Sequence, residues 1–182
     1  MSLIEDLQAR PASEAIRLLD ELAPAEIAGV LAELNPAFAQ EMLAELPALV
    51  RAEVMAAAPG RLGAQWSRNQ GYADGSLGRL MEPALAVFAA DTTVQAAIES
   101  LRDLVKSAQI TYGYIIDGGG RLQGIITMRD LLFSDKEARL GDIMLRDVFS
   151  LRPQMPLADA MRATLNRHYP VYPVCDDSGL LL

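Results

Sequence analysis

The chain has 182 residues, of which 51% are hydrophobic, so it is long enough to bury the core of one or two domains. Its 24 acidic side chains outnumber the 16 basic ones, and a net charge of −8 disfavours direct binding to nucleic acid or to anionic lipid but suits divalent cations. One cysteine, Cys175, and one histidine, His168, exclude an internal disulfide and a histidine-based metal cluster. No run of about 18 apolar residues occurs, so we expect a soluble chain that does not insert into a membrane.

Residues 13–70 contain a repeated helical pattern. The segments LLDELAPAE, VLAELNPAF and MLAELPALV begin at Leu18, Val30 and Met42, a period of 12 residues. Each is rich in Ala, Leu and Glu and then meets a proline, which disfavours helix at the residue before it. We expect an array of short helices over residues 1–71, stacked so that their leucines share one core.

From residue 77 onward, a different unit occurs twice. Residues 77–88, LGRLMEPALAVF, return as residues 140–151, LGDIMLRDVFSL, at an offset of 63. Residues 114–122, YIIDGGGRL, return as residues 173–181, PVCDDSGLL, at an offset of 59. Each copy is expected to form strand, helix, strand, Asp/Gly turn and strand, and the first copy adds a final helix. The pattern predicts a first repeat over residues 72–139 and an incomplete second repeat over residues 140–182.

The stretch GIITMRD, residues 124–130, occupies a predicted strand-to-helix junction. Thr127 and Asp130 lie one helical turn apart, which is the spacing of a helix cap. The same spacing also suits the binding of a ligand that needs both a hydroxyl and a carboxylate. The residues alone leave both interpretations open.

A duplicated β-α-β-β-α unit that carries Gly-apolar-apolar-Thr-x-x-Asp at its second strand-to-helix junction resembles the CBS repeat, named after cystathionine β-synthase. Here that motif begins at Gly124 and ends at Asp130. The resemblance implies two repeats paired about a pseudo-twofold axis, a homodimer through the CBS pair, and clefts that bind ATP or another adenine nucleotide.

The same resemblance assigns roles to individual residues. It places Asp130 at the ribose hydroxyls and Thr127 near phosphate, with the cation of Arg129 close by. Tyr112 is in a position that can face the adenine in this family, with packing as the alternative. Val148 and Phe149, expected to begin the first strand of the second repeat, either sandwich the base or fill the core.

Residues 71–83, GYADGSLGRLMEP, are similar to the junction that precedes the first CBS repeat in the MgtE family of magnesium transporters. The matching positions are Tyr72, Ser76, Gly78 and Met81. In that family a stack of short helices precedes the CBS pair, and a membrane channel domain follows it. The resemblance implies an α+β protein in which an all-α superhelical array is followed by a tandem CBS pair with a truncated second repeat.

We therefore expect the cytosolic regulatory region of an MgtE-like transporter, lying on the cytoplasmic side of the cell membrane and acting on a channel domain absent from this chain. Magnesium, bound weakly between acidic surfaces, would close the pore, and which carboxylates bind it is left open. A stand-alone CBS sensor of adenine nucleotides is the alternative. An enzyme is not expected, because the chain lacks a paired acid and base constellation.

Overall fold

The computed structural model describes residues 2–106, 108, 110–167 and 169–182, so the single histidine, His168, lies outside the described residues. The chain divides into two compact units, Met1–Pro83 and Ala84–Leu182. Residues 72–83, which the sequence placed at the start of the first repeat, pack with the first unit. Within the described ranges, no helix is long and apolar enough to cross a membrane.

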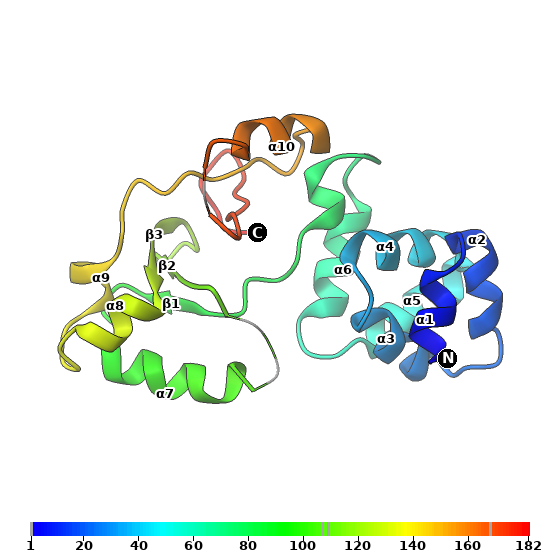
Figure 1. Ribbon diagram of the computed structural model, residues 1–182, viewed down its shortest axis with the longest axis horizontal. Helices are drawn as coiled ribbons and strands as arrows, with labels where there is room; N and C mark the ends of the chain where they lie inside the picture. The colour runs from blue at the N-terminus through cyan, green and yellow to red at the C-terminus, as the bar shows by residue number, and fades with distance from the viewer. Residues whose placement is uncertain (1, 107, 109, 168) are drawn as a thin grey trace. The chain divides into compact units, whose positions relative to one another are not determined.

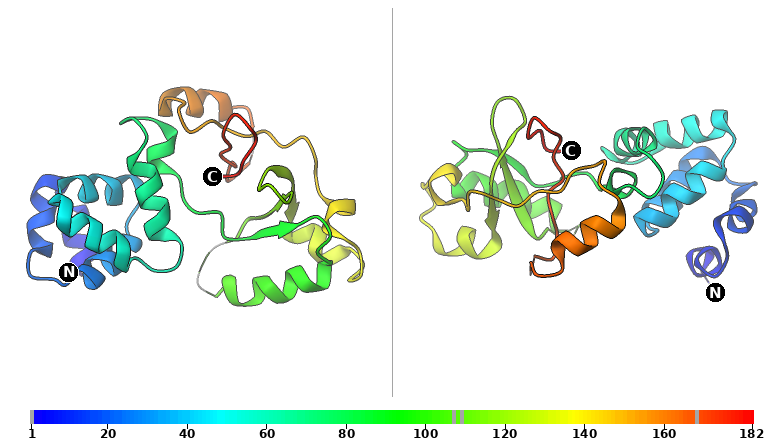
Figure 2. Two further views of the ribbon diagram at one scale, coloured as in Figure 1. Left: turned by 180° about the vertical axis from the view of Figure 1, so that it is seen from behind. Right: turned by 90° about the horizontal axis from the view of Figure 1, so that it is seen from above.

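The first unit is a stack of short helices (Figures 1 and 2). They are α1 (Leu3–Gln8), α2 (Ala12–Ala15), η1 (Ile16–Leu19), α3 (Pro24–Ala32), α4 (Pro36–Glu45), α5 (Ala48–Ala57), α6 (Leu62–Gln70) and η2 (Leu77–Leu80). Helices α3, α4 and α5 begin at residues 24, 36 and 48, which confirms the period of 12. Proline occupies the first position of α3 and of α4, where its missing N–H costs no helical hydrogen bond.

The core of the first unit is apolar and continuous along the stack. Most leucines at the matched positions of the repeated pattern are buried, and Trp66 closes the stack with only 4% of its surface exposed. The buried members are Leu7, Ala12, Ala15, Leu19, Ile27, Ala28, Leu31, Leu34, Ala39, Met42, Leu43, Leu46, Val54 and Trp66. Because each helix is short, burial against its neighbours supplies the stability that a single helix lacks.

The junction after α6 is fastened to the first unit by buried polar groups. The side-chain amide of Asn69 donates to the carbonyl of Met81 at 2.8 Å, and Asn69 is only 1% exposed. Gln65 donates in turn to the amide oxygen of Asn69 at 2.9 Å. The ring of Tyr72 lies against Gly78, where a Cβ atom would come within 2.4 Å of the ring. The Tyr-Ser-Gly-Met motif of the sequence therefore forms a packed edge of the helical unit.

The first repeat of the second unit has the predicted β-α-β-β-α order. Its elements are β1 (Val87–Ala89), α7 (Val94–Leu104), β2 (Tyr112–Ile116), β3 (Leu122–Thr127) and α8 (Met128–Phe133). The sheet order is β1-β2-β3, with β1 parallel to β2 and β2 antiparallel to β3. The side chain of Thr93 caps α7 by accepting the N–H of Ala96. Helix α7 lies below the sheet in Figure 1, and its apolar stripe faces the core.

The second repeat keeps the predicted offsets but not the predicted strands. Helices α9 (Leu140–Ile143) and α10 (Leu157–Thr164) begin 63 residues after η2 and α7. The expected strands are reduced in the described residues to isolated bridges, Leu151 with Val174 in parallel and Cys175 with Leu181 in antiparallel orientation. These pairings repeat the geometry of β1-β2 and β2-β3. Pro170 and Pro173 explain the shortening, because neither can donate to a strand partner.

The two Asp/Gly turns form as predicted and pair with each other. Asp117 accepts backbone N–H groups of its own turn, including that of Gly119 at 2.8 Å. In the second repeat, Asp176 accepts a hydrogen bond from the Ser178 hydroxyl at 2.8 Å and also from backbone N–H groups of its own turn. These hydrogen bonds hold the pKa of both carboxyls below the ordinary value of 3.8. Leu122 donates to Gly179 at 3.0 Å, and Leu181 donates to Gly120 at 3.1 Å. The two repeats therefore meet through their turns.

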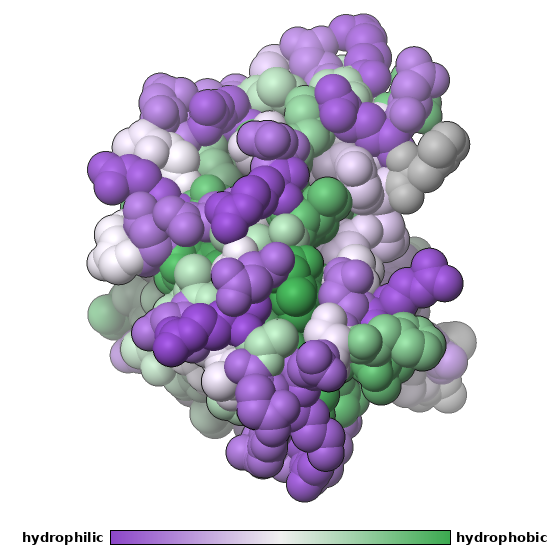
Figure 3. Space-filling model, turned by 90° about the vertical axis from the view of Figure 1, so that its left-hand side faces the viewer, coloured by the Kyte–Doolittle hydropathy of each residue, from purple (hydrophilic) through white to green (hydrophobic). Residues whose placement is uncertain are grey.

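The second unit buries a smaller core and leaves apolar side chains at its surface. Its buried members are Ala86, Phe88, Val94, Ala97, Leu101, Ile115, Ile126, Leu131, Leu140 and Met144. Leu132 and Phe133, at the end of α8, are 76% and 83% exposed. Figure 3 shows hydrophobic surface gathered through the middle of a largely hydrophilic face.

Candidate functional site

A cavity of about 140 Å³ lies in the second unit and takes its walls from both repeats. The first repeat contributes residues of β2 and β3, and the second contributes two segments that flank its isolated bridges. The lining residues are Tyr112, Ile125, Leu145, Arg146, Asp147, Val148, Phe149, Tyr169, Val171, Tyr172 and Pro173. Aromatic and aliphatic side chains make up most of the walls, and Arg146 and Asp147 add charged groups, a combination found in small-molecule sites.

Backbone pairing between the repeats builds one wall of the cavity. Ile125 on β3 donates to Leu145 at 3.0 Å and accepts from it at 2.9 Å, so the segment after α9 runs beside β3. Gly124 permits this approach, because a Cβ atom there would lie 2.7 Å from the carbonyl oxygen of Leu145. The pairing carries Val148 and Phe149 to the cavity.

Aromatic rings are concentrated at this cavity. Tyr172 meets Phe149 edge to face with ring centroids 6.2 Å apart, and it meets Tyr169 in the same manner at 5.8 Å. Burial raises the pKa of Tyr112 above its ordinary value of 10.0, and the hydroxyls of Tyr169 and Tyr172 add to that rise. The Tyr112 phenol is therefore neutral near pH 7, where it can donate a hydrogen bond.

Asp147 has an unusual backbone conformation at the cavity wall. Its φ of 56° lies in the left-handed region, which Asp tolerates better than most side chains but which remains uncommon outside glycine. This turn of the backbone separates Leu145, whose backbone pairs with β3, from Val148 and Phe149. Local strain of this kind is frequent at ligand sites.

The residues predicted from the sequence divide into two groups. Tyr112, Val148 and Phe149 line the cavity together, although Val148 and Phe149 precede the Leu151 bridge and do not begin a strand. The other predicted residues do not line it: Gly124, Thr127, Arg129 and Asp130. Of these, Thr127 is directly opposite Tyr112 in the register of β2 and β3, and Gly124 serves the approach of the two repeats.

Thr127 and Asp130 form a capping box at the start of α8. The carboxylate of Asp130 accepts the N–H of Thr127 at 2.9 Å through Oδ2, and the N–H of Asp130 is bonded to the Thr127 hydroxyl oxygen at 3.2 Å. Oδ1 of Asp130 takes part in none of these bonds. The structure therefore establishes the cap and keeps one carboxylate oxygen for another donor.

Sequence reasoning missed the segment from Tyr169 to Pro173, which supplies much of the second wall. The signal was available in the repeat, since the offset of 59 aligns Val171 with Tyr112. If the strand before the first Asp/Gly turn faces a cleft between the repeats, the matching segment of the second repeat is expected to face the same cleft from the other side. Arg146 and Asp147 carried no comparable signal.

The carboxylates among the described residues do not form a preassembled metal centre. Across the parts of the chain that the structure describes, no group of three or more His, Cys, Asp or Glu side chains could hold a metal ion.

Comparison with known proteins agrees with this architecture. The family model of the CBS domain matches residues 77–137 and 140–181. The magnesium transporter MgtE of Thermus thermophilus is 30% identical over 112 residues, which are 61% of this chain and 25% of that protein. This chain thus spans about a quarter of the length of the MgtE relatives that it matches.

Two solved structures extend the comparison. The cytosolic domain of the Mg²⁺ channel MgtE in complex with ATP has a TM-score of 0.81 and 27% identity, covering 98% of this chain and 73% of that chain. CBSX2 in complex with AMP has a TM-score of 0.51 and 28% identity, covering 61% of this chain and 87% of that chain. The chain belongs to the CBS domain family, and its helical unit followed by a CBS pair is homologous to the cytosolic domain of MgtE.

Proposed function

We propose that the chain is the cytosolic regulatory region of an MgtE-like magnesium transporter and that its CBS pair binds an adenine nucleotide. The observation that carries the nucleotide proposal is the aromatic cavity between the repeats, beside a strand end where Tyr112 and Thr127 are paired. The ATP complex of the related cytosolic domain and the AMP complex of CBSX2 support it.

The chemistry of the cavity suits the parts of a nucleotide. Its flat aromatic and aliphatic walls suit a planar base, which stacks favourably on such side chains. Asp130, in the first turn of α8, offers Oδ1 to ribose hydroxyls, and Arg129 beside it is exposed and cationic. Gly124 would act indirectly, because its missing side chain lets the two repeats approach each other closely.

Calorimetric titration with ATP and AMP tests this proposal. We expect binding to the unmodified chain and weaker binding after Tyr112→Leu, which removes an aromatic wall while leaving an apolar side chain. Leu132→Ala, on the exposed end of α8, serves as the control. If neither nucleotide binds at millimolar concentration, the nucleotide proposal is wrong.

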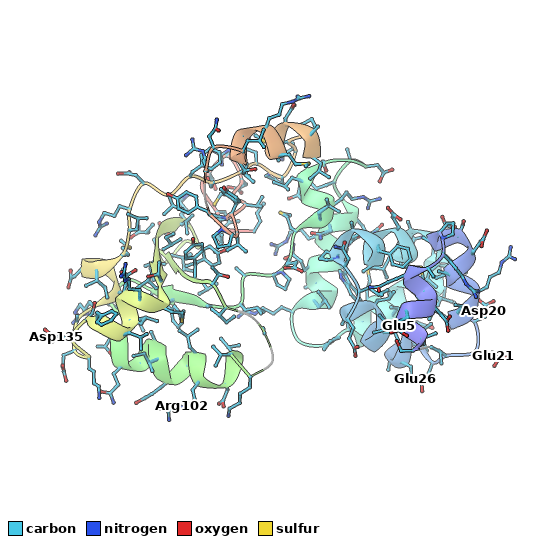
Figure 4. All side chains as sticks on the ribbon, viewed as in Figure 1. Glu5, Asp20, Glu21, Glu26, Arg102 and Asp135 are labelled. Carbon is cyan, nitrogen blue, oxygen red and sulfur yellow. The ribbon has the colours of Figure 1, made fainter. Side chains whose placement is uncertain are left out.

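We propose that magnesium binds between acidic surfaces of the protein, because acidic side chains are unevenly distributed along the chain. Residues 1–83 contain twelve Asp and Glu against six Arg, a net charge of −6, whereas residues 84–182 contain twelve against ten basic residues, a net charge of −2. Glu5, Asp20, Glu21 and Glu26 are exposed on the helical unit and are labelled in Figure 4. Divalent ions shared between acidic faces would relieve their repulsion, and would favour whichever state of the protein brings those faces together.

Two partners follow from the same proposal. The first is a membrane channel domain, which the regulatory region would hold closed when magnesium is abundant. The second is another copy of this chain, joined through the CBS pair. The exposed apolar ends of α8 and α10, represented by Phe133 at 83% and Leu165 at 74% exposure, support such a contact.

A stand-alone nucleotide sensor is the second candidate, and the similarity to CBSX2 favours it. The two functions differ in their response to magnesium. A nucleotide effect on the protein without any magnesium effect would favour the sensor.

A further inference from the structure

Arg167 makes a contact that the proposed nucleotide site does not explain. Its guanidinium carbon lies 3.7 Å from the centroid of the Phe149 ring, the geometry of a cation–π interaction. Arg167 takes part in none of the ion pairs among the described residues, so its charge is directed to this ring. Arg162 on α10 behaves differently and pairs with Asp159 at 2.6 Å.

Three side chains hold this arrangement in a closed set of contacts. The Tyr172 hydroxyl donates to the backbone carbonyl of Arg167, which fixes the chain just after α10. The Tyr172 ring meets the Phe149 ring edge to face at 89°. The Arg167 side chain then covers the Phe149 face. Each member is therefore placed by the other two.

The three side chains differ in whether they line the cavity. Phe149 and Tyr172 line the cavity, whereas Arg167 does not. The guanidinium therefore belongs to a side chain that does not line the cavity, whereas the ring that it covers does.

We infer that Arg167 is a positioning residue for base recognition, acting through Phe149 on the aromatic part of a bound nucleotide. This inference rests on the proposed nucleotide function. A cation on one face of the ring keeps the ring in a single orientation and draws its π electrons outward, which favours stacking of an electron-rich purine against the ring from the cavity. Because the ring is already ordered before the ligand arrives, less conformational entropy is lost on binding.

The test is a double-mutant cycle on the 182-residue chain, with ATP and adenosine as ligands. Arg167→Gln removes the cation and keeps a long polar side chain, and Phe149→Leu removes the ring and keeps an apolar one. Arg162→Gln makes the same change of charge on α10 and is the matched control. Circular dichroism and thermal unfolding verify that every variant is folded.

We expect Arg167→Gln to weaken the binding of both ligands by about two- to fivefold, the value of a partly exposed cation–π contact. Arg167→Lys should recover part of the loss, and Arg162→Gln should bind as the unmodified chain does. In the Phe149→Leu background, Arg167→Gln should have no further effect, because the ring through which it acts is gone.

The remaining outcomes overturn the inference and separate it from the proposed function. If the unmodified chain binds neither ATP nor adenosine, the proposed nucleotide function fails and the inference fails with it. If the chain binds but Arg167→Gln binds equally well, only the inference fails. If Arg167→Gln weakens the binding of ATP but not of adenosine, Arg167 acts at the phosphates. If Arg167→Gln still weakens binding in the Phe149→Leu background, Arg167 does not act through the ring.

Discussion

The Thr127 hydroxyl donates a 2.7 Å hydrogen bond to Oδ2 of Asp130. This bond shows that the motif residues cap α8, and it also fixes the carboxylate in one orientation. Capping and ligand binding, which are alternatives in the sequence, therefore become compatible in the structure.

Substitution of Asp130 separates these two roles. Asp130→Asn keeps an oxygen for the cap but removes the anionic acceptor, so we expect nucleotide binding to weaken by about 1.5–3 kcal/mol. Asp130→Ala should lose the same binding energy and in addition about 0.5–2 kcal/mol of folding stability with the cap. Calorimetry and urea unfolding measure the two effects, with the exposed Asp103→Asn on α7 as control. Equal nucleotide binding by all variants would leave Asp130 as a cap only.

Gly124 should be essential for the contact between the repeats. A Cβ atom at Gly124 would meet the Leu145 carbonyl and the Met144 sulfur at 2.7 Å, and a backbone carbonyl cannot move aside cheaply. We expect Gly124→Ala to lower the free energy of unfolding by about 1–3 kcal/mol and to reduce nucleotide affinity. Gly118→Ala, where nothing lies within 4 Å, is the control. Similar unfolding curves for both variants would contradict the described packing.

Asn69 should fasten the junction to the helical unit. Asn69→Ala leaves the Gln65 amide and the Met81 carbonyl without their partner in a buried setting. We expect a loss of about 1–3 kcal/mol in folding stability and faster proteolysis between Gly71 and Leu77. The exposed Asn166→Ala provides the comparison. Unchanged proteolysis in Asn69→Ala would show that the junction is held by other contacts.

Asp117 should make stability depend on acid pH. Backbone N–H donors lower the pKa of its carboxyl in the folded state below the ordinary 3.8, so the folded state binds fewer protons than the unfolded state in this range. The contribution is fully present above the unfolded pKa and is lost as the pH falls through the folded pKa. Unfolding of Asp117→Asn, compared with the unmodified chain from pH 6 to pH 2.5, should show a stability difference that shrinks on acidification. A difference that does not change with pH would contradict the turn geometry.

The parts of the fold that the sequence predicted well depend on local signals. Pro24 and Pro36 start their helices by local backbone geometry, independent of the segments that pack beside them. The Asp117 turn forms from hydrogen bonds within five residues. The cavity depends on contacts between distant segments. Nothing near Gly124 in the sequence reveals that Leu145 will lie against it. The prolines shorten the strands of the second repeat because they lack the N–H group that would bond to a neighbouring strand, and the sequence does not show which segment that neighbour is.

The sequence predicted those residues of the candidate site that could be located through the duplicated unit. Tyr112 and Phe149 were identified through the resemblance to the CBS repeat, and both line the cavity. Val171 could have been identified as well, because the offset of 59 aligns it with Tyr112. Arg167 could not, because its role depends on a side chain contact across the second repeat.

The central claim is that this region responds to magnesium through shared acidic surfaces, and small-angle scattering tests it most directly. The radius of gyration is measured with millimolar Mg²⁺ and with monovalent salt of the same ionic strength. The double variant Asp20→Asn with Glu21→Gln is compared, since both residues are exposed and neither caps a helix as Glu5 and Glu26 do. We expect Mg²⁺ to make the unmodified chain more compact than monovalent salt does, and the variant to respond less, because screening alone supplies no bridging coordination. An equal response to Mg²⁺ and to monovalent salt would contradict the claim.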